Sequence, residues 1–187
     1  MEVASTVIAE VKVIKTEKHS DNRGFFSEIY NKQSFSGAGF HLEFVQDNHS
    51  FSASAGVVRG LHFQVAPFVQ CKLVRVVRGK ILDVAVDLRR GSPTFGKYVA
   101  ATLSRENWNQ LFVPVGFAHG FCTLESGTEV IYKVSNYYSA ACDRGLFWND
   151  PELDIPWPVS EGNAILSEKD RRLPRFSQLV ELFDYRS

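Results

Sequence analysis

The chain contains 187 residues, 44% of them hydrophobic, and its 21 lysines and arginines equal its 21 aspartates and glutamates in number. A chain of this length buries roughly two-thirds of its unfolded surface, so we expect a single domain spanning residues 1–187. Without net charge, no overall field attracts nucleic acid or an anionic membrane, and an anionic ligand must be held by local cations.

The three cysteines, Cys71, Cys122 and Cys142, form no CxxC pair and leave one residue unmatched. This spacing argues against a disulfide framework and against a zinc ribbon. Residues 1–20 lack the continuous apolar segment of a signal peptide, and no stretch approaches the ~18 apolar residues of a membrane-spanning helix. We therefore expect a cytoplasmic protein without a membrane partner.

The N-terminal residues are predicted to form a hairpin-like arm. Val11 and Val13 alternate with a lysine, and Asp-Asn-Arg-Gly at 21–24 predicts a turn into a short aromatic-rich strand at 25–30. Further along, polar residues crowd together at 46–50, which favours a binding segment or a capped turn.

The segment 56–64, Gly-Val-Val-Arg-Gly-Leu-His-Phe-Gln, combines a β-branched strand with a glycine and a histidine. Taken alone, His62 is more readily interpreted as a partly buried structural histidine than as a chemical group. Strict alternation places Arg59 and His62 on opposite faces of the strand. Both can line one pocket only if Gly60 marks a β-bulge or if the strand ends there.

Two alternating runs at 72–77 and 81–88 are joined by Arg-Gly-Lys at 78–80, a pattern that predicts a β-hairpin. Four apolar residues of the second run are expected to share one face: Leu82, Val84, Val86 and Leu88.

The rest of the chain continues as short strands separated by Gly, Pro and Asn. Further strands are predicted at 98–103, 111–113, 120–124 and 128–134, with one helical turn at 104–107 and a helix within 173–183. A spacing of about ten residues between strands predicts an all-β sandwich or barrel rather than βαβ units.

The sequence Pro-Val-Gly-Phe-Ala-His at 114–119 resembles the second half-motif of cupins, in which the turn aims the histidine into a barrel. The first half-motif would require two histidines separated by one residue, yet Gln64 stands two residues after His62 and no glutamate follows closely. Because the usual ligand set is incomplete, we predict that no metal is bound.

Nine short motifs lie along most of the chain. They are Asp21-x-Arg23-Gly24-x-Phe26-x-Glu28, then residues 46–50, 59–64, 72–75, 83–89, 92–96, 114–121, 148–151 and 166–170. Their order and spacing resemble the dTDP-4-dehydrorhamnose 3,5-epimerase family. The resemblance implies an all-β cupin jelly roll (a double-stranded β-helix barrel) with an N-terminal strand arm and a short C-terminal helical segment.

The resemblance also implies an activity. It predicts a homodimeric epimerase that needs no cofactor and inverts C3 and C5 of dTDP-4-dehydro-6-deoxy-D-glucose, giving dTDP-4-dehydro-L-rhamnose. Inversion beside a ketone requires a base on one face, an acid on the other, and a donor or cation near the ketone oxygen to stabilise the enolate.

The family's pattern assigns these roles to four residues. His62 matches the base, Asp170 the carboxylate that pairs with it, Tyr132 the proton donor, and Lys72 the group near the ketone oxygen. From the residues alone, Asp170 would be a solvated carboxylate, Tyr132 a core tyrosine and Lys72 a surface lysine on an edge strand. The resemblance favours the chemical roles, and alternation independently turns Tyr132 towards the interior.

The same pattern predicts how the substrate is bound. It maps six residues to the dTDP half and two more to the pocket lining: Arg23, Phe26, Glu28, Gln46, Asn48 and Arg59, then His119 and Lys169. Phe26 and Tyr138 would stack on the two faces of thymine. Asp143 stands where the family commonly has a longer glutamate. The resemblance further implies that the N-terminal arm is exchanged across the dimer.

Three other functions remain open at this stage. One is an epimerase that inverts only C3 or C5 of a related dTDP-4-keto-deoxysugar. Another is a non-catalytic cupin that binds a sugar nucleotide, and the third is a metal-dependent cupin oxygenase.

Overall fold

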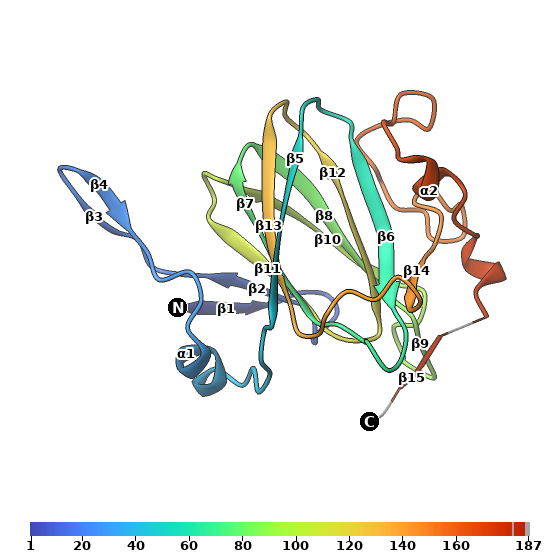
Figure 1. Ribbon diagram of the computed structural model, residues 1–187, viewed down its shortest axis with the longest axis horizontal. Helices are drawn as coiled ribbons and strands as arrows, with labels where there is room; N and C mark the ends of the chain where they lie inside the picture. Colours follow the sequence, from blue (N-terminus) through green and yellow to red (C-terminus); the bar gives the residue numbers. More distant parts are fainter. Residues whose placement is uncertain (181, 186–187) are drawn as a thin grey trace.

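The computed structural model describes residues 1–180 and 182–185. Two antiparallel sheets pack face to face (Figure 1). The six-stranded sheet has the order β1 (Glu2–Ser5), β2 (Lys12–Lys15), β11 (Asn109–Val113), β7 (Lys72–Arg78), β13 (Thr128–Val134) and β5 (Gln46–Ser52). The five-stranded sheet has the order β10 (Tyr98–Ser104), β8 (Lys80–Asp87), β12 (Phe117–Thr123), β6 (Val58–Gln64) and β14 (Asp143–Gly145). The prediction of an all-β jelly roll is confirmed.

The remaining elements are short and lie outside the two large sheets. They are the hairpin of β3 (His19–Asp21) and β4 (Gly24–Phe26), the parallel pair of β9 (Arg89–Arg90) and β15 (Phe183–Asp184), the helices α1 (Lys32–Gly37) and α2 (Glu168–Arg171), and the 3-10 turn η1 (Phe176–Gln178). Within the described residues, no helix is long and apolar enough to cross a membrane.

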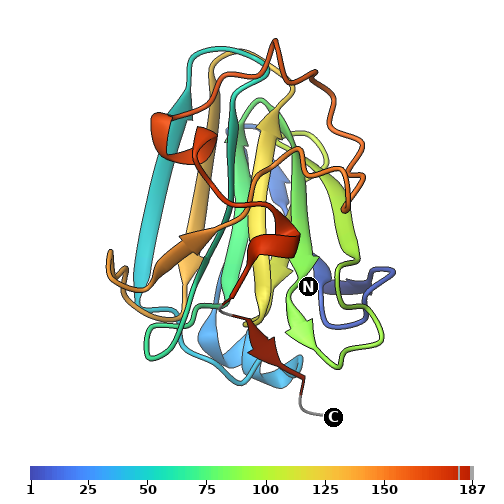
Figure 2. The same ribbon diagram turned by 90° about the vertical axis from the view of Figure 1, so that its right-hand side faces the viewer.

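The main core fills the space between the sheets. Val74 and Val76 of β7 meet Ala85 of β8 and Phe117 and Phe121 of β12 in one buried cluster. The outer face of the five-stranded sheet is also buried, because the C-terminal segment crosses it (Figure 2). Three apolar residues of β8 and Leu88, which directly follows it, were predicted to share a face, and all four pack in this second cluster.

The predicted hairpin between β7 and β8 is wrong. β7 pairs with β11 and β13, whereas β8 pairs with β10 and β12 in the other sheet. Gly79, with a φ of 77°, turns the chain from one sheet to the other. β8 is buried on both faces, so it is stabilised between two neighbours inside a sheet that is covered on both sides.

The N-terminal arm is present as predicted, since β3 and β4 form a hairpin that projects from the body of the molecule (Figure 1). Its strand ends at Phe26, and helix α1, which was not predicted, follows after a short link. The side chain of Asn31 caps α1 by accepting from the backbone N–H groups of residues 33 and 34. Phe35 of α1 packs with Phe40 and Phe112 on the outer face of the six-stranded sheet.

The helical turn predicted at 104–107 is wrong, whereas a short C-terminal helical segment is present as α2 and η1. Residues 105–107 form a turn, and within 173–183 the described residues contain only η1 and the start of β15, while residue 181 lies outside them. Phe176, Leu179 and Phe183 pack on the outer face of the five-stranded sheet along an irregular course. Apolar contacts with that sheet therefore decide the path, and helical propensity does not.

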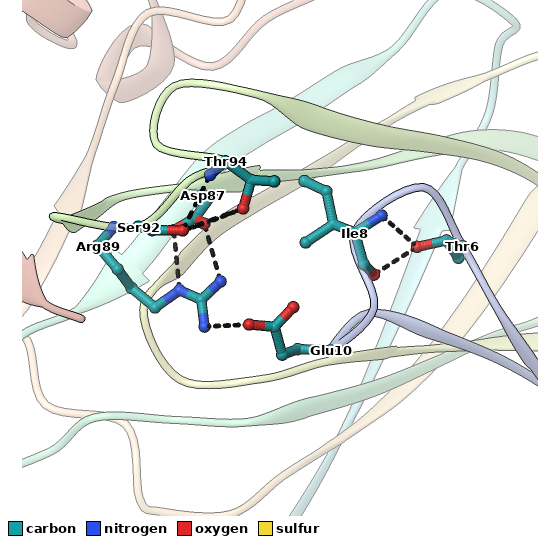
Figure 3. Close-up of polar contacts among 7 residues, drawn as sticks. All are labelled: Thr6, Ile8, Glu10, Asp87, Arg89, Ser92 and Thr94. Atoms are coloured by element: carbon teal, nitrogen blue, oxygen red, sulfur yellow. Dashed lines mark hydrogen bonds and ion pairs between the residues drawn. The ribbon is translucent and has the colours of Figure 1, made fainter. Parts of the chain in front are cut away.

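A buried carboxylate organises the loop after β8 (Figure 3). Asp87 accepts hydrogen bonds from Arg89, from the Ser92 hydroxyl at 2.6 Å and from the Thr94 hydroxyl at 2.7 Å. Burial opposes its ionisation, but these donors together lower the pKa of Asp87. Arg89 also reaches Glu10 at 2.9 Å, so the cluster fastens the loop between β1 and β2 to the five-stranded sheet.

Candidate active site

Two adjoining cavities open between the sheets. The large cavity has a volume of about 560 Å³ and the small cavity about 320 Å³. Four residues line both of them: His62 on β6, Lys72 on β7, Tyr132 on β13, and Lys169 on α2. The cavities therefore meet at three of the four side chains that the family's pattern assigned to chemistry, together with Lys169, and Asp170 lines only the large cavity.

A β-bulge at Gly60 decides which side chains enter the large cavity. The register between β6 and β12 shifts at this point. Gly60 has a φ of 123°, and a Cβ there would lie 2.6 Å from the Cα of Gly120, so only glycine fits. The bulge reverses the alternation, and Arg59 and His62 both line the large cavity. The condition stated from the sequence is thereby confirmed.

His62 is paired with a buried carboxylate. Its Nε2–H donates to Oδ1 of Asp170 at 2.5 Å, and the Asp170 side chain is only 5% exposed. Burial opposes ionisation of Asp170. Hydrogen bonds from His62, from the Ser167 side chain and from the Gly60 backbone outweigh this effect, so the pKa of Asp170 is lowered. Because the ionised carboxylate only accepts, it holds the proton on Nε2 and leaves the lone pair on Nδ1.

Tyr132 lies on the inward face of β13 and packs against the main core. Burial raises the pKa of the phenol, Arg59 lowers it, and Asp143 raises it, with a net increase. The hydroxyl therefore keeps its proton at neutral pH and is available as an acid. The predicted inward orientation of Tyr132 is confirmed.

Lys72 reaches the same place from β7. Its Nζ donates to the backbone carbonyl of His62 at 3.3 Å. Burial lowers the pKa of Lys72 to about 8, against the opposing influence of Asp143 and Asp83. The ammonium is thus a cation inside the cavity with only partial compensation, which suits it to meet a developing negative charge.

A second histidine–carboxylate pair borders the large cavity. His119 donates from Nε2 to Oδ1 of Asp83 at 2.7 Å, and both side chains are buried. Burial lowers the pKa of His119, although Asp83 raises it, so the ring is held neutral. His119 was predicted from the sequence, but Asp83 was not. The sequence did contain a signal for Asp83: it is a carboxylate in an otherwise largely apolar strand, on the face opposite Leu82 and Val84.

The small cavity is bordered by a polar network. Gln46 donates from Nε2 to Asn48 at 2.8 Å and accepts from the backbone N–H of Tyr138 at 3.1 Å. Asp143 accepts from the Tyr138 hydroxyl at 3.1 Å and forms an ion pair with Lys169. The shorter carboxylate at 143 is therefore engaged with its neighbours, and these five predicted residues lie together.

Gln64 supports this network and was not predicted as a site residue. Its side-chain amide donates to the carbonyls of Phe68 and Tyr137 and accepts from the N–H of Ser139 at 2.7 Å. It thereby fixes the loop that presents Tyr138. Where a cupin metal site would have its second histidine, this chain has a structural brace.

Three predicted residues lie apart from both cavities. Arg23, Phe26 and Glu28 belong to the arm and its base, and none lines the large or the small cavity. Arg23 is paired with Asp21 in its own hairpin at 2.5 Å, and Phe26 is 71% exposed. Phe26 lies opposite His19 at the open end of the projecting hairpin, and most of its ring faces solvent.

Within the described part of the chain, no group of three or more His, Cys, Asp or Glu residues is arranged to hold a metal ion. The two histidine–carboxylate pairs have their Nε2 atoms occupied by Asp170 and Asp83. The arrangement brings together a polarised imidazole, a neutral phenol and an ammonium. Such groups can remove a proton next to a carbonyl, stabilise the enolate and return a proton.

The comparisons with known proteins agree with this chemistry. Residues 5–178 match the family model described as dTDP-4-dehydrorhamnose 3,5-epimerase. A protein of that name from Sinorhizobium fredii is 52% identical over 97% of this chain and 92% of its own. A crystal structure of dTDP-4-dehydrorhamnose 3,5-epimerase from Bacillus anthracis, with TDP and PPi bound, is 52% identical, with a TM-score of 0.90 over 93% of this chain and 98% of that one.

A further crystal structure shows a relative with a sugar nucleotide. It is dTDP-6-deoxy-D-glucose-3,5-epimerase from Legionella pneumophila in complex with dTDP-4-keto-L-rhamnose, which is 40% identical, with a TM-score of 0.94 over 100% of this chain and 99% of that one. The likeness therefore extends over the whole jelly roll and not only over isolated motifs.

Proposed function

The chain belongs to the dTDP-4-dehydrorhamnose 3,5-epimerase family of isomerases, and from this premise we propose how its own residues carry out the reaction. The substrate is dTDP-4-dehydro-6-deoxy-D-glucose and the product is dTDP-4-dehydro-L-rhamnose. The observation that carries the proposal is the meeting of His62, Lys72 and Tyr132 where the two cavities join.

Nδ1 of His62 removes the proton from the carbon next to the ketone. The Asp170 carboxylate stabilises the imidazolium that results, because it already accepts the Nε2 proton at 2.5 Å. Tyr132 then donates its phenolic proton to the opposite face of the same carbon, which inverts it. Before the second carbon reacts, the protonated His62 releases its proton to solvent and the Tyr132 phenolate takes one back from solvent. Two such cycles, at C3 and at C5, then complete the conversion without an added cofactor.

The negative charge of the enolate falls on the ketone oxygen, and Lys72 is the cation that stabilises it. Arg59 adds a second cation to the lining of the large cavity, whereas the neutral ring of His119, whose Nε2–H is donated to Asp83, adds an acceptor at Nδ1. Losing one preorganised donor of this kind typically costs about 3 kcal/mol of the barrier.

The alkaline limb of the pH profile is expected to report Lys72. The ammonium is present below its pKa of about 8 and is lost as the pH rises through that value, so kcat/KM should fall there. Lys72→Met should be slower by roughly 100-fold to 1,000-fold and should lack this fall. Initial rates from pH 6 to 10 test both points. An unchanged alkaline limb in Lys72→Met would assign it to another group.

The dTDP half occupies the small cavity and the arm of a second subunit. Gln46, Asn48 and Lys169 supply polar contacts there, and Tyr138, which is 59% exposed, offers an aromatic face to thymine. Phe26 supplies the other face and Arg23 and Glu28 the remaining contacts, all from the exchanged arm of a homodimer. The exposure of Phe26 and Tyr138 supports this arrangement. Sedimentation measures the oligomeric state under assay conditions, and full activity of a protein that sediments as a monomer would contradict the arrangement.

Proton exchange in heavy water tests the proposed function. With dTDP-4-dehydro-6-deoxy-D-glucose and no added metal, deuterium should enter the product at both C3 and C5, as read by NMR. Deuterium at one carbon alone would indicate a single-site epimerase. Binding of the nucleotide sugar without any exchange would indicate a non-catalytic cupin.

Two further expectations from the sequence remain proposals. One is that residues 1–187 act as one domain. The other is a cytoplasmic location, for which the support is that Cys71, Cys122 and Cys142 are all free thiols.

A further inference from the structure

The Trp-Asn-Asp-Pro motif at 148–151 has no place in the chemistry described above, and it lines neither cavity. Its aspartate, Asp150, is only 2% exposed. One carboxylate oxygen accepts from the backbone N–H of Glu152 at 2.8 Å, and the other accepts from the backbone N–H of Phe176 at 2.7 Å. A buried carboxylate thus joins two segments that are distant in the sequence.

Phe176 belongs to the segment that directly follows α2, the helix carrying Asp170. A second contact holds the same segment, because the N–H of Phe147 donates to the carbonyl of Pro174 at 2.7 Å. A third is the packing of Leu173 against Gly145, where a Cβ would lie only 2.8 Å from the leucine side chain. Figure 2 shows this segment running across the face of the molecule.

The segment is also anchored before α2. Ile165 forms a parallel bridge with Val57, and the N–H of Val58 donates to the carbonyl of Ile165 at 3.0 Å. Helix α2 itself has only four residues, which is too short to be stable without its surroundings. The position of Asp170 is therefore set by the two anchors, one at Ile165 and the other at the contacts of residues 173–176.

We propose that Asp150 is a positioning residue for the epimerisation. Its carboxylate holds residue 176 and so keeps α2 in the place where Asp170 meets His62. The inference rests on the proposed function, in which His62 is the base. It assigns the Trp-Asn-Asp-Pro motif to the support of that base from outside the cavities.

Asp150→Asn is the first test, because the amide has one acceptor oxygen and cannot accept from both N–H groups. We expect kcat to fall roughly 10-fold to 100-fold, because a small displacement of a reacting group slows the chemical step. KM should change less than kcat, because Lys169 is the one residue on α2 among those proposed to bind dTDP. The matched control is Asp154→Asn, an exposed aspartate of the same loop, which should keep the activity of the original chain. An unchanged kcat in Asp150→Asn would overturn the proposal.

A double-mutant cycle separates positioning from general loss of stability. In an Asp170→Asn background the pair with His62 is already broken, so adding Asp150→Asn should cause no further fall in kcat. Losses that multiply would overturn the proposal. Full activity of Asp170→Asn would instead refute the role of the His62–Asp170 pair in the proposed function, which distinguishes the two failures.

A second pair of variants tests the contact from its other end, and also serves if Asp150→Asn does not fold. Phe176 is the first residue of η1 and follows an extended Arg175, a position that accepts proline. Phe176→Pro and Phe176→Ala both remove the ring, but only the proline removes the N–H donated to Asp150. We expect kcat to fall in Phe176→Pro and not in Phe176→Ala. The downfield NMR signal of the proton between His62 and Asp170 should likewise be lost only in Phe176→Pro. Equal kcat in both variants would refute the contact's role.

Discussion

His62→Asn is expected to lower the rate of epimerisation, and of deuterium exchange at C3 and C5, by roughly 10³-fold or more, since general bases contribute about 10² to 10⁴. Asparagine preserves a polar side chain in the cavity but cannot accept a proton at neutral pH. The Asp170 carboxylate would then face an amide, so it would have no imidazolium to stabilise.

The measurement is the NMR time course of exchange in heavy water with the original chain and the variant side by side. His49→Asn is the matched control, because His49 is exposed on the outer face of β5 and contacts Glu129 at 3.1 Å. His49→Asn should exchange the protons at C3 and C5 at the rate of the unsubstituted protein. Exchange at either carbon that survives in His62→Asn would assign proton removal to a different base.

Tyr132→Phe separates proton removal from proton return. The variant loses one oxygen atom, and the ring keeps its contacts with the main core. His62 and Lys72 remain, so the enolate should still form, and His62 should return a deuteron to the face from which the proton came. We expect product formation to fall roughly 100-fold or more, while recovered substrate acquires deuterium without inversion.

NMR of the recovered substrate and product, together with product yield, measures this split. Tyr98→Phe is the control, since the Tyr98 hydroxyl donates to the Asp154 carbonyl at 3.3 Å on the outer surface. It should behave like the original chain. Unchanged inversion at both carbons in Tyr132→Phe would show that another group supplies the proton.

The sequence predicted the strands well where short-range alternation sufficed, as at 72–77 and 128–134. It failed where the partner of a strand mattered. The link at 78–80 has the composition of a hairpin turn, but the crossing between sheets depends on β8 being covered on both faces, which is a tertiary property. Helix α1 is six residues long and depends on its packing and on the Asn31 cap, so it gave little periodic signal.

For the active site, the family's pattern and the bulge argument at Gly60 predicted most of what the cavities contain. Asp83 and Gln64 were not predicted, because Asp83 is hydrogen-bonded to another site residue, His119, and Gln64 to the backbone of a loop. Such partners are far apart in sequence, 36 positions in the case of Asp83 and His119. Asp150 was visible as part of a motif, yet its contact with Phe176 joins residues that only the folded chain brings together.

The close approach of Gly60 and Gly120 has a practical consequence for redesign. A Cβ on Gly120 would lie 2.7 Å from the Arg59 carbonyl, just as one on Gly60 would strike Gly120, so neither position tolerates enlargement even when the other stays glycine. Libraries that aim to admit new sugars should keep this glycine couple constant and vary the cavity lining instead. The contact between the two glycines fixes the spacing of β6 and β12, so side chains of the cavity can be exchanged without moving the main chain.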